Sequence, residues 1–98
     1  AAVAQMQTIQ AKNLPIKYIP KIVEGYEYAL GEWIESTGTD GKSKVISCPA
    51  LTGTWPLIDK CNNYACILFL KDKIGDEQKD IYLKLKKAID SQMSPGCN

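Results

Sequence analysis

IKYIPKIVEGYEYALGEWI, residues 16–34, is the stretch of sequence that decides the predicted fold. Its apolar residues recur at the spacing of an α-helix and would form one stripe about a third of the helix circumference wide, as expected of a helix packed on a core. This predicted core stripe consists of Ile16, Ile19, Ile22, Val23, Tyr26, Leu30, Trp33 and Ile34. Thr37-Gly38 supplies the end of the helix, because glycine readily takes the left-handed conformation beyond a helix terminus.

The residues before this stretch leave two interpretations of where the helix begins. Ala1–Lys12 consists mainly of good helix formers, which favours helix from the start of the chain. Pro15 and Pro20 each remove a backbone hydrogen bond and clash with the preceding turn. The helix either begins near Pro20, a suitable first-turn residue, or runs continuously with kinks at both prolines. Because Ile16 already lies on the stripe, the pattern favours the kinked helix.

The rest of the chain predicts a small head of mixed structure. Lys44–Cys48 has the composition of a short strand, and the apolar run Ala65–Leu70 is typical of a buried strand. Pro49–Pro56 predicts an irregular connection. Asp76–Met93 fits both the alternation of a strand and the spacing of a helix, and the capping residue Asp76 favours the helix. The sequence thus predicts a single α+β domain over residues 1–98, with a long N-terminal helix packed on a small antiparallel sheet.

Four cysteines indicate how so short a chain gains stability. A domain of 98 residues buries only about 60–65% of the surface that its unfolded chain exposes. An even number of cysteines predicts two disulfides and an oxidising, extracytoplasmic compartment, while reduced thiols in a cytosolic protein remain the alternative. The cysteines are Cys48, Cys61, Cys66 and Cys97, and the favoured pairing is Cys48–Cys61 with Cys66–Cys97, which fastens irregular segments outside the helix.

Composition excludes several functional classes. The net charge is +1 and every basic residue is lysine, so the forked guanidinium groups that recognise phosphate and guanine are missing and nucleic-acid binding is disfavoured. The chain has no histidine, which removes the commonest catalytic base and the histidine that a zinc site with few cysteines needs. Asp40 and Asp59 do not follow the spacing of a calcium loop. We therefore predict no catalytic site, no metal and no cofactor.

Several segments resemble a protein family. Ala1–Ala4 is similar to the small residues that close the membrane segment of a type IV pilin, and Ile9–Lys12 and Val23–Ala29 are similar to the polar run after it. Glu35–Gly38 resembles the exit from the pilin spine helix. Lys87–Gly96 resembles the ending of minor pilins and pseudopilins. The chain departs from the family at Gln5, where pilins usually carry a proline.

The resemblance implies a soluble, N-terminally truncated pilin domain with a spine helix at residues 1–37 and a globular head at residues 38–98. It implies a structural subunit of an extracellular, bacterial-surface filament or fimbrium serving adhesion, motility, DNA uptake or secretion. Its partners would be other pilin subunits, and an anchor in the inner membrane would lie in a missing segment that carries the family's processed, methylated N-terminus. Met6, Ile9 and Leu14 would form the assembly face, and Cys97 would fit the disulfide that pins a pilin's C-terminal region. The alternative is a secreted, disulfide-stabilised effector or toxin-like binding protein.

Overall fold

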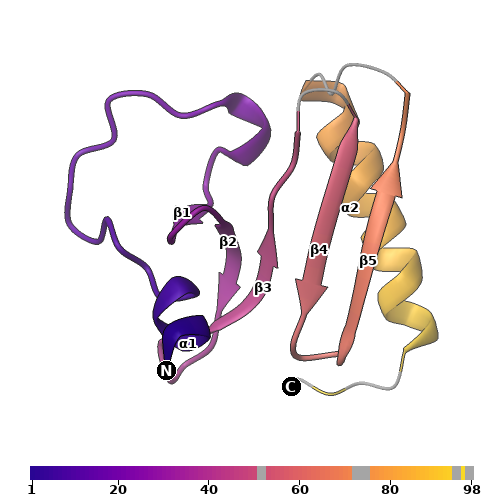
Figure 1. Cartoon of the computed structure of the whole chain (residues 1–98). Helices are drawn as coiled ribbons and strands as arrows, with labels where there is room; N and C mark the ends of the chain where they lie inside the picture. The colour runs from indigo at the N-terminus through magenta and orange to yellow at the C-terminus, as the bar shows by residue number, and fades with distance from the viewer. Residues whose placement is uncertain (51–52, 72–75, 94–95, 97–98) are drawn as a thin grey trace.

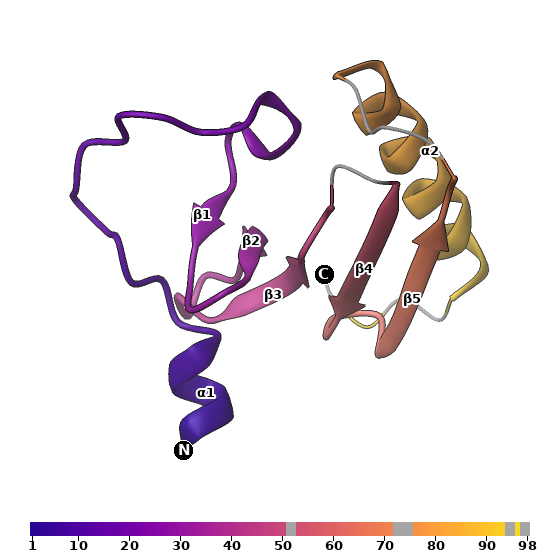
Figure 2. The same cartoon turned by 45° about the horizontal axis from the view of Figure 1, so that its top comes forward.

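A five-stranded antiparallel sheet with a helix on one face forms the body of the protein in the computed structural model, which describes residues 1–50, 53–71, 76–93 and 96 (Figure 1). In chain order the elements are α1 (Ala2–Met6), the 3-10 helix η1 (Lys21–Val23), β1 (Glu27–Tyr28), β2 (Trp33–Thr37), β3 (Ser43–Ser47), β4 (Thr54–Asp59), β5 (Tyr64–Phe69) and α2 (Asp76–Gln92). The strands lie in the sheet in the order β1-β2-β3-β4-β5. Seen from a second direction, α2 lies beside β4 and β5, while α1 lies near β1 and β2 at the other end of the sheet (Figure 2).

The predicted spine helix over residues 1–37 is wrong, because only α1 and η1 are helical in that range. Pro15 and Pro20 lie in irregular chain, where neither has to fit into a helix. Gly25 and Gly31 have φ angles of +89° and +78°, a left-handed conformation that turns the chain away from a helical path. β1 and β2 form around the second of these glycines and pair antiparallel. The predicted division into a spine and a head therefore does not describe this fold.

The residues of the predicted core stripe are spread over different parts of the structure. Ile22, Val23 and Ile34 are buried, whereas Ile16 and Leu30 are 67% and 51% exposed. The other three, Ile19, Tyr26 and Trp33, are half-buried and pack against a cluster of Ile22, Val23, Val45, Trp55, Leu57 and Tyr82. Ile34 belongs to a second cluster with Ala29 and Ile46. The helical spacing therefore reflects burial in two separate clusters.

Predictions for the second half of the chain are largely confirmed. The strands expected at Lys44–Cys48 and Ala65–Leu70 correspond to β3 and β5, and the helix expected at 76–93 is α2. The expected burial of the second strand is wrong, because the residues of β5 alternate between half-buried and exposed. The last three residues of the irregular connection predicted over Pro49–Pro56 instead begin strand β4, and residues 51–52 lie outside the described residues. Pro56 lies opposite Cys48, which is one residue beyond the end of β3. The missing N–H of Pro56 therefore removes no hydrogen bond from within the β3–β4 ladder.

The predicted disulfide pairings are wrong. Cys48 and Cys66 are free thiols, and each of the two pairings contains one of them. Cys61 is disulfide-bonded, and Cys97 lies outside the described residues. A side chain at Gly96 would collide with the backbone carbonyl of Cys61, so the chain near its C-terminus passes tightly against the turn between β4 and β5.

Alternation along β4 and β5 separates two faces of the sheet. The inner face is covered by α2, whose Tyr82 stacks on Trp55 with ring centroids 3.6 Å apart and planes 8° from parallel. The residues of β4 and β5 on this inner face are Trp55, Leu57, Asp59, Tyr64, Cys66 and Leu68. The residues that alternate with them face away from α2.

Candidate functional site

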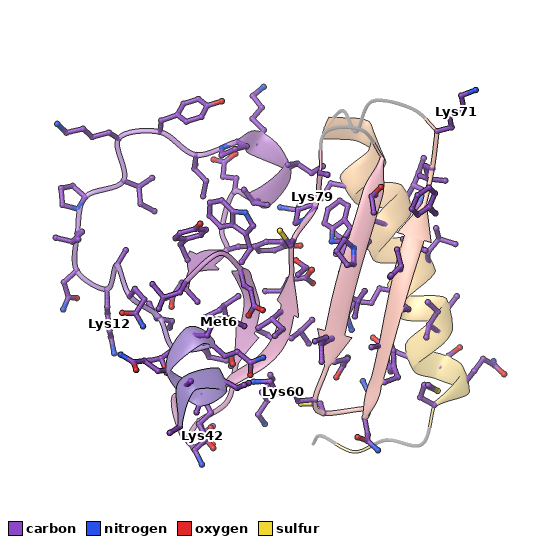
Figure 3. The ribbon with its side chains drawn as sticks, in the orientation of Figure 1. Met6, Lys12, Lys42, Lys60, Lys71 and Lys79 are labelled. Carbon is purple, nitrogen blue, oxygen red and sulfur yellow. The ribbon has the colours of Figure 1, made fainter. Side chains whose placement is uncertain are left out.

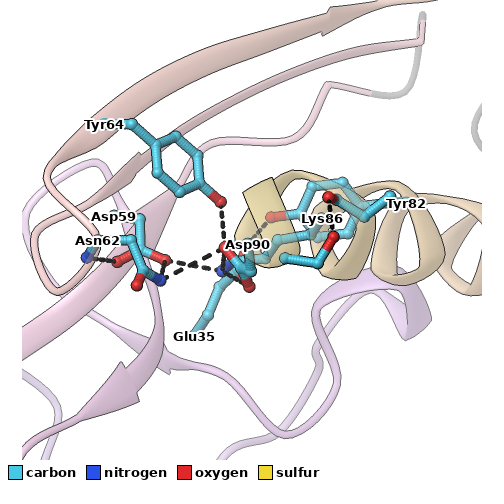
Figure 4. Close-up of polar contacts among 9 residues, drawn as sticks. Glu35, Asp59, Asn62, Tyr64, Tyr82, Lys86 and Asp90 are labelled. Atoms are coloured by element: carbon cyan, nitrogen blue, oxygen red, sulfur yellow. Dashed lines mark hydrogen bonds and ion pairs between the residues drawn. The ribbon is translucent and has the colours of Figure 1, made fainter. Parts of the chain in front are cut away.

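The first candidate site is a polar network between α2 and the turn that joins β4 to β5 (Figure 4). The ammonium group of Lys86 lies 2.8 Å from Asp59 Oδ2 and 2.9 Å from Asp90 Oδ2. Asn62 donates from its backbone N–H and from its side-chain amide to the two oxygens of Asp59, at 2.9 and 3.0 Å. The hydroxyl of Tyr64 donates to Asp90 over 2.6 Å. Every charged group of this network thus has a partner inside it.

The pKa values in the network follow from burial and these contacts. Burial alone would raise the pKa of Asp59, but the hydrogen bonds from Lys86 and Asn62 outweigh it and hold the pKa below its usual range. Burial alone would lower the pKa of Lys86, and the hydrogen bonds to Asp59 and Asp90 raise it above its usual range. Both groups are therefore fixed in their charged forms, which suits a structural ion pair better than a group that exchanges protons in catalysis.

A second polar contact joins α2 to β2. The hydroxyl of Tyr82 donates to Glu35 Oε1 at 2.6 Å, and burial followed by the neighbouring Glu35 charge raises the pKa of this hydroxyl well above its usual value. Tyr82 is only 2% exposed. The contact and the polar network fasten α2 to the sheet, and the two grooves described below are lined by other residues.

The second candidate is the face of β4 and β5 that points away from α2. We call this surface the open face and define it as Cys48, Pro56, Ile58, Ala65, Ile67 and Phe69. Phe69 is 81% exposed, Ile67 64% and Ile58 44%. On the β2–β3 half of the same side, Ile34 and Ile46 are buried and Ile9 packs against them. The N-terminal segment therefore covers one half of this side of the sheet and leaves the apolar half on β4 and β5 uncovered.

A groove with a volume of about 300 Å³ runs across the open face. Its walls come from β3, β4 and β5 and include Ile46, Cys48, Ile58 and Ile67. Glu32, just before β2, also lines the groove, and its Oε2 atom is buried without a hydrogen-bond partner among the described residues. A buried carboxylate oxygen without a partner is costly, so a cationic group from outside would be stabilised at this position.

A larger cavity of about 710 Å³ lies between the irregular segment at residues 9–19 and strands β1 and β2. The rings of Tyr28 and Trp33 contribute to its wall and meet edge to face with centroids 4.8 Å apart. The side chains of Leu14, Ile16 and Tyr18 on the irregular segment are strongly exposed. Lys12, Lys17 and Glu27 complete the charged part of the lining, which carries no concentrated charge of either sign.

The residues of the predicted assembly face do not form one surface on a helix. Met6 ends α1 and accepts a hydrogen bond on its carbonyl from the Leu30 N–H. Ile9 packs against the cluster of Ala29, Ile34 and Ile46, and Leu14 is exposed on the irregular segment. The N-terminal segment is thereby attached to the body of its own domain.

Sequence reasoning missed the open face, although the signal was present. The run Ala65–Leu70 is apolar at every position, and in an antiparallel sheet such a run makes both faces of the strand apolar. Only one of these faces has a helix to cover it. Among the described residues, no three histidine, cysteine, aspartate or glutamate side chains gather as metal ligands. Nor is any helix in the described ranges long and apolar enough to cross a membrane.

Comparison of the chain with protein-family models, curated proteins and solved structures found no match.

Proposed function

We propose that this protein is a non-catalytic protein-binding domain whose contact surface is the open face. The observation that carries the proposal is the contiguous apolar surface of Ile58, Ala65, Ile67 and Phe69, which no element in the described part of the chain covers. Contiguous exposed apolar surface of this kind is typical of interaction sites, whereas single exposed apolar residues are ordinary. The groove beside it supplies a concave place for an inserted side chain.

The polar groups support binding over catalysis. The chain contains no histidine, and the charged groups with shifted pKa values, Asp59 and Lys86, are bound to each other and do not line the groove. Cys66 is half-buried, and burial first raises the pKa of its thiol, which disfavours the reactive thiolate. We extend the proposal to location: the disulfide at Cys61 favours a secreted protein in an oxidising compartment.

The partner that best fits the open face is an amphipathic helix of another protein. The inner face of the same strands already packs α2, so a helix on the open face would complete a sheet covered on both sides. Its apolar stripe would cover Ile58, Ile67 and Phe69. A lysine or arginine at the edge of that stripe would reach Glu32, whose buried Oε2 atom has no partner in the described structure.

This proposal develops the binding-protein alternative from the sequence. The filament-subunit hypothesis assigned assembly to a continuous helix over residues 1–37, and that helix is absent from the structure. The N-terminal segment is also hydrogen-bonded to its own domain, since Gln10 donates to the carbonyl of Tyr28 and Leu30 donates to that of Met6. A helix-mediated filament contact therefore has no structural support in the described residues.

The proposal is tested with a display library of amphipathic helical peptides with randomised apolar and charged positions. We expect the selected peptides to be rich in lysine or arginine at one edge of the stripe and to lose about tenfold in affinity for Glu32→Gln, as removal of one charged hydrogen bond should cost. Ile67→Thr should weaken binding similarly. Ile16→Thr is the matched control, because Ile16 and Ile67 are 67% and 64% exposed.

Two results would contradict the proposal. One is a library selection that yields no binder, or only peptides that bind Ile67→Thr as tightly as the unchanged protein. The other is turnover in a broad screen of hydrolase substrates, which would show that the domain is an enzyme. Affinities are measured by calorimetric titration at fixed ionic strength, because salt screens the contact with Glu32.

A further inference from the structure

Strand β5 is one edge of the sheet, and the hydrogen-bond pattern identifies which of its backbone groups have no partner strand. Leu70 N–H donates to the carbonyl of Gly53 over 2.9 Å, which fixes the phase of the ladder between β4 and β5. In an antiparallel pair alternate residues direct both backbone groups at the partner strand, so Leu68, Cys66 and Tyr64 face β4. The N–H and C=O groups of Ala65, Ile67 and Phe69 therefore point away from the sheet.

β5 has none of the features by which proteins usually protect a sheet edge. Tyr64–Phe69 contains no charged residue and no proline. Its register against β4 is regular over all six residues, whereas the pairing of β2 with β3 shows irregularities. Edge strands that do not pair with another chain usually carry lysine, proline or a bulge. An uncharged, regular, apolar edge strand is a template for pairing with another strand.

We propose that a second copy of this chain adds to the sheet by antiparallel pairing of β5 with β5, about a two-fold axis at Ile67. This inference deepens the proposed function, since it names one partner for the edge of the same surface. The axis places Ile67 opposite Ile67 of the second copy and Ala65 opposite Phe69 of the second copy. The smallest outward residue thus meets the largest, and all three outward-pointing residues of each strand enter the new ladder.

The polar residues beside the apolar edge favour this register over its neighbours. With the axis at Ile67, Lys71 lies opposite Asn63 of the second copy, so no polar residue faces an apolar one. Sliding one strand by two residues in one direction places Lys71 opposite Ala65, and sliding it by two residues in the other direction places Asn63 opposite Phe69. Lys71 follows the end of β5, beyond the apolar part of the edge (Figure 3). The alternation of exposed apolar residues and this terminal lysine therefore fit a second β5 strand.

The paired arrangement keeps the open face available. Strands added at an edge extend the sheet sideways, so the open faces of the two copies become one continuous apolar surface while α2 of each copy stays on the inner face. The ladder contains only three outward residues per chain, which is short for an interface. We expect a reversible dimer with a dissociation constant on the order of 10–100 µM.

Sedimentation equilibrium over a concentration series tests the dimer, with two charge variants at the axis. Ile67→Lys places two ammonium groups face to face and should weaken association at least tenfold, as should Ile67→Glu through its carboxylates. An equimolar mixture of the two variants should associate again, because lysine then faces glutamate. Ile16→Lys is the matched control, with 67% against 64% exposure, and should leave association unchanged.

Hydrogen exchange of the unchanged protein gives a reading that needs no variant. The amides of Ala65, Ile67 and Phe69 should gain protection as concentration rises, while the amides of Tyr64, Cys66 and Leu68 are already protected by β4. A monomer at millimolar concentration, or association that Ile67→Lys does not change, overturns the dimer. If the chain is monomeric but selected helical peptides still bind the open face, the proposed function stands alone. If the chain dimerises and no peptide binds, only the dimer stands.

Discussion

Replacing Trp55 with alanine is expected to lower the free energy of unfolding by about 3–5 kcal/mol, the range for removing a large buried aromatic side chain. Trp55 is 3% exposed, lies in β4 and stacks on Tyr82 of α2. The substitution therefore removes the stacked aromatic contact between α2 and β4 and leaves a cavity. Chemical denaturation followed by circular dichroism measures the loss.

Trp33→Ala is the matched control for this prediction. Trp33 is half-buried at the border of the same cluster, where it meets Tyr28 edge to face. Trp33→Ala should lower the free energy of unfolding clearly less than Trp55→Ala does. Equal losses for the two variants would show that α2 is not held by the stacked pair.

Lys86→Met is expected to lower the free energy of unfolding by about 3–5 kcal/mol, because it leaves the charge of Asp59 buried without its cationic partner. The side chain of Asp59 is 1% exposed, and among the described residues only Asn62 would remain to donate to it. Lys84→Met, an exposed position on the same helix, should change stability by less than about 0.5 kcal/mol. Combining Lys86→Met with Asp59→Asn should recover part of the loss, and a double variant less stable than the single one would contradict the argument.

The same ion pair predicts how stability depends on pH. The pKa of Asp59 is lower in the folded protein than in the unfolded chain, so its contribution is complete above the unfolded value of about 4 and is lost as the pH falls through the folded value. In Lys86→Met, burial acts without the opposing lysine, so the pKa of Asp59 in the folded variant is higher than in the unchanged protein and Asp59 contributes less stability that acid can remove. The difference in the free energy of unfolding between the two proteins should therefore shrink as the pH falls below about 4, because Asp59 is then protonated in both, as measured by chemical denaturation at a series of pH values.

Sequence reasoning failed at residues 16–34 for an identifiable physical reason. Periodicity records which residues are buried, and Ile22, Val23 and Ile34 are indeed buried. It does not record the backbone conformation that buries them. The backbone preferences of two prolines and two glycines disfavour a continuous helix here, namely Pro15, Pro20, Gly25 and Gly31. The apolar stripe instead reflects residues buried in two different clusters.

The second half of the chain was easier to predict because its local signals agree. The helix expected over residues 76–93 is found as α2 (Asp76–Gln92), where the acidic residues near the start of the sequence pattern favoured a helix over a strand. The apolar run Ala65–Leu70 forms β5, although the sequence does not show that α2, the next element, covers only one of its faces. The cysteine pairing failed because Cys48 and Cys66 remain free thiols, and spacing along the sequence does not show which cysteines the fold brings together.

The order of strands in the sheet has a consequence for how the chain folds. Each strand pairs with its neighbour in sequence, so the contact order of the sheet is low and each hairpin can form by closing a short loop. Docking of α2 is the long-range step, since Tyr82 must reach Glu35 across a separation of 47 residues. We therefore expect folding on a millisecond timescale, with hairpins in the transition state and the stack of Tyr82 on Trp55 formed after it. Trp55→Ala would then act mainly by accelerating unfolding.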